Sequence, residues 1–323
     1  MKFDLDAQQR DFATSIDAAL GAADVPAAVR AWAAGDTAAG RRIWARLADL
    51  GVTALLVPER HDGIGAHPVD LMVALERCGR WCVPGPVTES IAVAPLLLSG
   101  APDEAERAGA LAAGELIVTV AAPPAVPRAV NADVAGLVLH AAPGGGVVTV
   151  AEPGAGFASV DPTRTGFAVD PTGARWDADT ARAYEFGALG TAAQLIGAGQ
   201  ALLDASVDYA AQRTQFGRVI GSYQAIKHKL ADVHIALEMA RPLLYGAALS
   251  LAEHGTDTAR DVSAAKVAAA DAALLAAQSA LQTHGAIGFT AEHDLSMWLL
   301  RVQALRPAWG NPATHRRRVL EAI

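Results

Sequence analysis

Apolar residues recur at helical spacing over most of the chain, and one middle segment has strand-like runs instead. The first helical pattern ends near Gly51, has Asp36 in position to cap it, and repeats apolar residues three and four apart at Ile43, Trp44, Leu47 and Leu50. The following residues 52–58 predict a short extended piece. Pro68 is a good first-turn residue for a further helix, and two shorter helices are expected near 88–99 and 103–113.

The middle segment has apolar runs at 116–120, 136–140 and 146–150, with Pro and Gly clusters between them. Such runs, bounded by turn residues, are typical of strands. Three long helical patterns then follow, at 194–213, 224–254 and 257–284, with a short last helix. We therefore expect a mainly α protein with a small β domain, divided into an N-terminal helical domain (1–117), a shortened β domain (118–186) and a C-terminal bundle (187–323).

Composition excludes several classes of function. The 323 residues carry a net charge of −8 without a long basic run, which argues against nucleic-acid binding. No stretch offers 18 consecutive apolar residues without charges, so no membrane span is predicted. The N-terminal residues lack the apolar core of a signal peptide, which favours a cytoplasmic protein. Cys78 and Cys82 lie four apart, which fits neither a redox pair nor a metal site, so we expect buried free thiols and no metal.

The link between the first two long helices carries the most informative chemistry. It contains Arg213, Gln215, Phe216 and Gly217, and Gln224 begins the next helix. A guanidinium pairs well with a pyrophosphate, an aromatic ring packs on an apolar ring system, and a glycine lets backbone approach closely. The combination indicates a site for a large, flat, phosphorylated ligand.

This link, together with residues 281–293 (Leu-Gln-Thr-His-Gly-Ala-Ile-Gly-Phe-Thr-Ala-Glu-His), resembles two signatures of the flavin-dependent acyl-CoA dehydrogenases. Residues 57–65 (Val-Pro-Glu-Arg-His-Asp-Gly-Ile-Gly) and 75–90 are also similar to that family. The resemblance implies an acyl-CoA dehydrogenase-like fold with an N-terminal helical domain, a truncated middle β domain and a C-terminal helical bundle. It covers most of the first zone and nearly all of the last.

The resemblance also implies residue roles. In the family these positions bind FAD across a subunit interface. Arg213 would contact the pyrophosphate, Gln215, Phe216 and Gln224 the dinucleotide, and a turn would receive the far end of the same FAD through Gln282, Gly285 and Gly288. Family members often have glycine where this chain has Ala286. Any one of these residues could have a purely structural role, since a glycine can end a helix and a glutamine can cap one.

Two parts of the family's active site are missing. The family's catalytic carboxylate occupies one of two positions, which correspond here to Gly187 and Gly310. Glu185 is the remaining candidate base, two residues from the first of them. The β domain is short, and only residues 151–153 (Ala-Glu-Pro) resemble the strand and loop that hold the flavin ring.

The resemblance and its gaps together imply the small, non-catalytic subunit of a heteromeric (α2β2) acyl-CoA dehydrogenase. A full-length homologue would supply the base and the flavin-ring site, and this chain would complete the shared FAD site. Actinobacterial enzymes of this kind act on steroid-derived CoA thioesters, and electron-transfer flavoprotein is the family's usual acceptor. Two alternatives stay open: a self-sufficient homo-oligomeric dehydrogenase that uses Glu185, and a structural pseudoenzyme without flavin.

Overall fold

The computed structural model describes residues 5–142, 145–290 and 292–323. The N-terminal part is helical. Its α-helices are α1 (Ala7–Gly21), α2 (Val25–Ala33), α3 (Ala38–Asp49), α4 (Pro68–Arg80), α5 (Ala94–Leu98) and α6 (Glu104–Ala112). Short 3-10 turns η1 (Val52–Ala54) and η2 (Glu59–His61) follow α3, and a π-helical segment η3 (Thr88–Val93) runs directly into α5.

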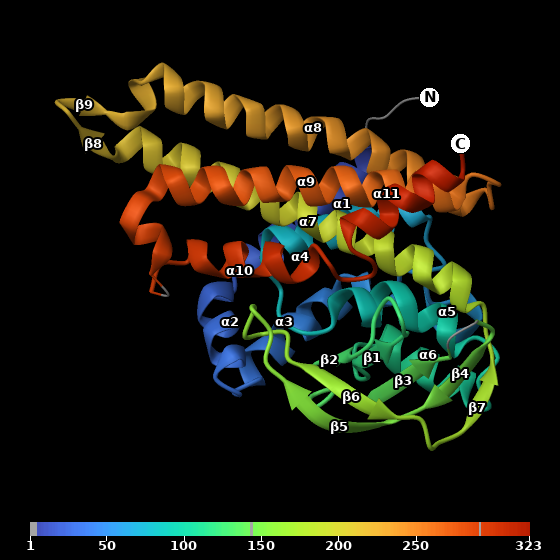
Figure 1. The fold of residues 1–323 in the computed structure, drawn as a ribbon. Coiled ribbons are helices and arrows are strands. Elements are labelled where there is room, and N and C mark those ends of the chain that lie inside the picture. Colours follow the sequence, from blue (N-terminus) through green and yellow to red (C-terminus); the bar gives the residue numbers. More distant parts are fainter. Residues whose placement is uncertain (1–4, 143–144, 291) are drawn as a thin grey trace.

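The β domain consists of two small sheets below the helical bundle in Figure 1. One has the order β1-β3-β4-β7 and the other β2-β6-β5, and only the β1–β3 pair is parallel. The strands are β1 (Val118–Ala121), β2 (Ala129–Val130), β3 (Leu137–Ala141), β4 (Val147–Val150), β5 (Glu152–Phe157), β6 (Gly166–Asp170) and β7 (Arg175–Asp177).

The C-terminal part is a bundle of long helices that runs across the whole molecule in Figure 1. A two-stranded hairpin projects from one end of the bundle, between α7 and α8. The elements are α7 (Thr180–Gln212), β8 (Thr214–Gln215), β9 (Arg218–Val219), η4 (Ile220–Ser222), α8 (Gln224–Ala252), α9 (Thr258–His284), η5 (Gly285–Phe289), α10 (Leu295–Leu305) and α11 (Pro312–Glu321).

Close backbone packing joins the N-terminal domain to the bundle. A Cβ added to Gly197 on α7 would lie 1.9 Å from the carbonyl oxygen of Glu76 on α4, and one added to Gly79 would lie 2.1 Å from that of Gln194. Neither glycine can carry a side chain without moving one helix off the other. The two helices therefore pack backbone to backbone at this crossing.

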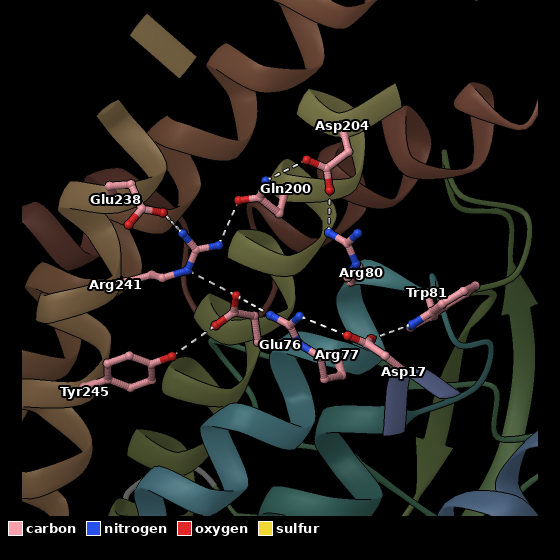
Figure 2. A network of polar contacts seen from close by, with 10 residues as sticks. All are labelled: Asp17, Glu76, Arg77, Arg80, Trp81, Gln200, Asp204, Glu238, Arg241 and Tyr245. Carbon is pink, nitrogen blue, oxygen red and sulfur yellow. Dashed lines mark hydrogen bonds and ion pairs between the residues drawn. The ribbon is translucent and has the colours of Figure 1, made fainter. Parts of the chain in front are cut away.

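A polar network surrounds the same crossing and ties together α1, α4, α7 and α8 (Figure 2). Its centre is the carboxylate of Glu76, which is 1% exposed and accepts from Arg77 at 2.7 Å, Arg241 at 3.2 Å and Tyr245 at 3.4 Å. Arg241 also donates to Gln200 at 2.9 Å, so the chain of contacts continues onto α7. A buried carboxylate needs such partners, because an unpaired charge in the interior is strongly destabilising.

The structure confirms the mainly α fold with a small β region and corrects several details. Residues 52–58 are not extended: Val52–Ala54 form a 3-10 turn whose residues are all buried. The helix α7 begins at Thr180 and is therefore longer than the predicted pattern at 194–213. Two short helices, α10 and α11, follow α9 instead of one.

Cys78 and Cys82 are buried free thiols, as predicted, and burial raises the pKa of Cys78 to about 12 and that of Cys82 to about 11. By length and composition, α7, α8 and α9 are each apolar enough to cross a membrane. In α7, 89% of the most apolar window is buried inside the protein, against 39% in α8. The absence of a membrane span thus stays a prediction.

Candidate functional site

The link that carries the first motif folds into an exposed hairpin, which we call the arm (residues 213–223). Thr214 pairs with Val219 and Gln215 with Arg218, and the two-residue turn between them is Phe216-Gly217. Phe216 has φ 51° and Gly217 has φ 79°, the positive values that a tight turn between twisted strands requires. The backbone N–H of Ile220 donates to the carbonyl oxygen of Arg213 at 2.8 Å and closes the base of the arm.

The arm presents its side chains to solvent. Phe216 is 93% exposed, although a large aromatic ring would normally be covered, and its left-handed backbone adds strain. Within the described residues, the guanidinium of Arg213 has no hydrogen-bond or ion-pair partner, whereas Arg218 lies over the ring of Tyr223 at 4.0 Å. Tyr223 Oη also donates to the carbonyl oxygen of Gln215 at 3.1 Å. One arginine therefore supports the arm and the other is free to bind a ligand.

Gln224 lies at the exposed first position of α8. The residue before it makes no side-chain capping hydrogen bond, and the first turn contains no acidic residue. The carbonyl oxygen of Tyr223 accepts from Ile226 and Lys227, so the capping residue leaves the backbone N–H groups of Gln224 and Ala225 unsatisfied. A helix start of this kind favours a negatively charged ligand.

The second motif forms the turn at the end of α9. Gln282 is exposed on the last helical turn, and Gly285 ends the helix with φ 62° and ψ −137°, a conformation that other residues avoid. A Cβ at Gly285 would meet no other heavy atom within 4 Å, so the surface beside this backbone is open. Gly288 is buried, while Ala286 is exposed.

Contacts between helices bring the two motifs together at one end of the bundle (Figure 1). The ring of Tyr209, one turn before Arg213, stacks on His284 with ring centroids 4.4 Å apart. His284 is buried, and burial lowers its pKa, which fits a role in packing. Lys229 on α8 donates to the side-chain oxygen of Gln282 on α9. The two motifs thus lie at the same end of the bundle.

The two positions at which the family places its base lie together elsewhere, and both are closed. Gly187 is buried in α7, where an added Cβ would lie 2.3 Å from the indole ring of Trp309. Trp309 is 1% exposed and donates through Nε1 to the carboxylate of Glu89 at 3.1 Å. The indole therefore occupies the space in which a side chain at position 187 would have to lie.

Gly310 is closed by its own turn. Its φ is 97°, and an added Cβ would lie 2.6 Å from both His315 Nε2 and Tyr184 Oη. These two groups hold the turn by donating to the carbonyl oxygen of Trp309, at 2.9 Å and 3.1 Å. Since a carbonyl oxygen only accepts, His315 carries its proton on Nε2 and accepts at Nδ1 from Ser263. Burial lowers the pKa of His315 to about 4, so the ring is neutral in this arrangement.

Glu185 is two residues from Gly187 but its carboxylate is paired with Arg318 on α11. Burial raises the pKa of Glu185, and Arg318 opposes that shift. The carboxylate is 14% exposed and holds the C-terminal helix against α7. A role as a base would require this ion pair to open.

The arm and the base positions lie at opposite ends of α7. From Gly187 to Gln212 the helix rises by 25 residues, or roughly 38 Å at 1.5 Å per residue. Glu152 and Pro153, the faint match to the flavin-ring strand, begin the exposed edge strand β5. No described residue of the arm or of the α9 turn therefore faces a base position of this chain.

A buried ionic cluster beside Trp309 was missed at the level of sequence. Arg301 on α10 is fully buried and donates to Asp161 at 2.6 Å and to Thr163 at 2.9 Å. Arg164 lies 3.6 Å from Glu89, and both are almost completely buried. The only local signal is the dense run of polar residues at 161–164, which looks like a solvated loop until its partners on η3 and α10 are known.

The residues at the exposed end of the bundle fit an FAD molecule. An unpartnered guanidinium, an exposed aromatic ring, an unsatisfied helix N-terminus and an open glycine turn are the groups that bind a dinucleotide. At the closed end, positions 187 and 310 have no room even for a Cβ atom. The exposed end therefore has groups suited to part of a cofactor, and Glu185 is the carboxylate that lies nearest in sequence to position 187.

Comparisons with known proteins identify the family of the chain. Residues 6–115 match the acyl-CoA dehydrogenase N-terminal domain, and residues 177–323 match the acyl-CoA dehydrogenase C-terminal domain. The acyl-CoA dehydrogenase IpdE2 of Mycobacterium tuberculosis is 31% identical over 277 residues, which cover 85% of each chain. The homologous IpdE2 of Mycolicibacterium smegmatis is 31% identical over 296 residues, which cover 91% of this chain and 92% of that one.

Solved structures share the fold over the whole chain. A chain of the ChsE4-ChsE5 complex from Mycobacterium tuberculosis has a TM-score of 0.86 at 24% identity, and covers 99% of this chain and 98% of its own. Butyryl-CoA dehydrogenase from Megasphaera elsdenii has a TM-score of 0.87 at 18% identity, covering 100% and 99%. The two matched domains, the relatives of equal length and the shared fold lead to one conclusion: this chain belongs to the acyl-CoA dehydrogenase family.

Proposed function

We propose that this chain is the non-catalytic subunit of a heteromeric acyl-CoA dehydrogenase and completes the FAD site of a full-length partner. The observation that carries the proposal is the separation along α7: the cofactor-binding residues lie at one end of the helix and the closed base positions at the other. Residues of the arm can reach a flavin only if it is held by another subunit. An α2β2 heterotetramer is the simplest closed assembly that repeats this arrangement twice.

In the complex, Arg213 pairs with the pyrophosphate, while Phe216, Gln215 and Gln224 contact the dinucleotide. Gln282, Gly285 and Gly288 receive its far end. Bound FAD supplies the acceptor for the hydride that leaves the acyl chain. This chain binds and orients the cofactor, and the partner provides the base and the acyl-CoA pocket.

A steroid-derived acyl-CoA is the substrate class we propose. A further structural neighbour is described as the Tcur3481-Tcur3483 steroid ACAD, with a TM-score of 0.85 at 19% identity. Like the ChsE4-ChsE5 complex, this structural neighbour is named for two proteins. Electron-transfer flavoprotein as the acceptor and a cytoplasmic location are parts of the same proposal.

The deciding experiment measures FAD content of the chain purified alone and co-expressed with a full-length homologue. The proposal expects a colourless chain alone and a yellow complex with about one FAD per heterodimer. Arg213→Ala should then lower flavin retention in the complex without unfolding the subunit. A yellow homo-oligomer whose flavin is reduced by acyl-CoA would refute the proposal in favour of the alternative in which Glu185 is the base. Absence of flavin from both preparations would leave a structural pseudoenzyme.

A further inference from the structure

Gln282 is held in one orientation by a residue outside the two motifs. Lys229 lies on the second turn of α8, half-buried, and its ammonium group donates to Oε1 of Gln282 on the last turn of α9. An ammonium group can only donate, so it fixes which end of the amide faces α8. The Nε2 group of Gln282 is left with no protein partner among the described residues.

The contact with Lys229 decides which end of the Gln282 amide can face a ligand. A free side-chain amide can present either its oxygen or its nitrogen to a ligand, and a phosphate or ribose oxygen needs a donor. With Oε1 engaged by Lys229, the two N–H groups of Gln282 remain available to a ligand at this exposed end of α9, where a Cβ added to Gly285 would also meet no heavy atom within 4 Å. Holding the amide in advance removes the entropy loss of ordering it when the ligand binds.

We propose that Lys229 is a positioning residue for the cofactor, which acts through Gln282 by directing its amide nitrogen toward an oxygen acceptor of the bound dinucleotide. The inference rests on the proposed shared flavin site and adds the polarity of one contact within it. Lys229 also brings a positive charge to this surface, so the experiment has to separate orientation of Gln282 from simple electrostatic attraction of the cofactor.

The test measures the rate of FAD dissociation from the complex with the full-length homologue. Lys229→Met keeps the aliphatic stem and removes the donor. It should speed FAD loss roughly fivefold, within the two- to tenfold range of one net hydrogen bond. Lys229→Arg retains a donor and should stay near the wild-type rate. The matched control is Lys227→Met, which removes the same charge from an exposed lysine two residues earlier on α8.

Two further variants separate the mechanisms. Gln282→Glu preserves the acceptor for Lys229 but replaces the outward amino group by an oxygen, and it should speed FAD loss more than Lys229→Met does. In a Gln282→Ala background, adding Lys229→Met should not change the rate of FAD dissociation further. If Lys229 acts only through Gln282, the effects of the two substitutions are not additive in a double-mutant cycle.

The inference is overturned if Lys229→Met and Lys227→Met change the rate equally, or if the two substitutions in the cycle are additive, since either result means a direct effect of charge. Thermal unfolding of the isolated variants checks that each chain is folded. An unchanged rate in Arg213→Ala would overturn the shared flavin site itself, and this inference with it. Loss of flavin in Arg213→Ala but not in Lys229→Met would leave the proposed function intact and reject only the role of Lys229.

Discussion

Restoring a side chain at Gly310 should destabilise the protein and not create a dehydrogenase. Two separate effects contribute to the loss. A residue other than glycine at φ 97° costs about 1–2 kcal/mol of backbone strain. A Cβ 2.6 Å from His315 Nε2 and Tyr184 Oη also displaces both donors of the Trp309 carbonyl, at about 1 kcal/mol each. We therefore expect Gly310→Ala to lower the free energy of unfolding by about 3–4 kcal/mol, and Gly310→Glu by more.

Urea unfolding of the isolated chain measures this loss, and Gly35→Ala is the matched control. Gly35 has φ 90°, but an added Cβ there would meet nothing within 4 Å, so only the strain should appear. The difference between the two alanine variants, about 2 kcal/mol, isolates the displaced hydrogen bonds. Equal losses in the two variants would refute the description of the closed turn.

In the complex with the full-length homologue, Gly310→Glu should not add acyl-CoA oxidation beyond that of the partner's own sites. If acyl-CoA reduced an additional equivalent of bound flavin in that variant, at a faster rate, this chain would contain a usable substrate pocket.

The remaining predictions concern buried charges. Burial lowers the pKa of Lys266 from 10.5 to about 7, so the unfolded chain binds the additional proton between pH 7 and 10.5, and stability should rise with pH across that window. Lys266→Met should remove this rise, at most about 1.4 kcal/mol per pH unit, in urea unfolding measured from pH 7 to 10. Glu185→Gln breaks the ion pair with Arg318 and should leave turnover of the complex unchanged, whereas loss of turnover would support Glu185 as the base. Arg301→Met leaves Asp161 buried and unpaired and should cost about 3–5 kcal/mol, while a loss below 1 kcal/mol would contradict the buried ion pair.

Sequence patterns were sufficient to predict most of the helices and to propose the candidate site, because both depend on local regularities. Apolar periodicity located α3, α4, α8 and α9 to within a few residues. The candidate cofactor residues could be named because they occur in two contiguous motifs, and the structure adds the contacts between the motifs. Apolar periodicity did not predict the start of α7. This part of the helix is buried on nearly all sides and contains small residues such as Gly187 and Gly190, so its sequence has no alternation of apolar and polar faces.

What sequence could not supply are pairings between distant segments. Arg301 lies 140 residues from Asp161, and Trp309 lies 220 residues from Glu89, so neither pair has a local pattern. Glycine at positions 187 and 310 suggested only that a carboxylate is missing. The structure shows why none fits there: the adjacent aromatic and histidine side chains fill the space on both sides.

The difference between a missing carboxylate and a position with no room for one affects whether a base could be regained. A position that merely lacks a carboxylate could regain one by a single substitution. Here Trp309 packs on Gly187 and donates a hydrogen bond to Glu89. Its carbonyl oxygen accepts hydrogen bonds from Tyr184 and His315. Regaining a base would therefore require several buried groups to change together. The helix α7 runs without a break from this closed end to the arm. Under the proposed function, a partner subunit covers Phe216 on the arm, which is 93% exposed, while the closed end stays packed within this chain.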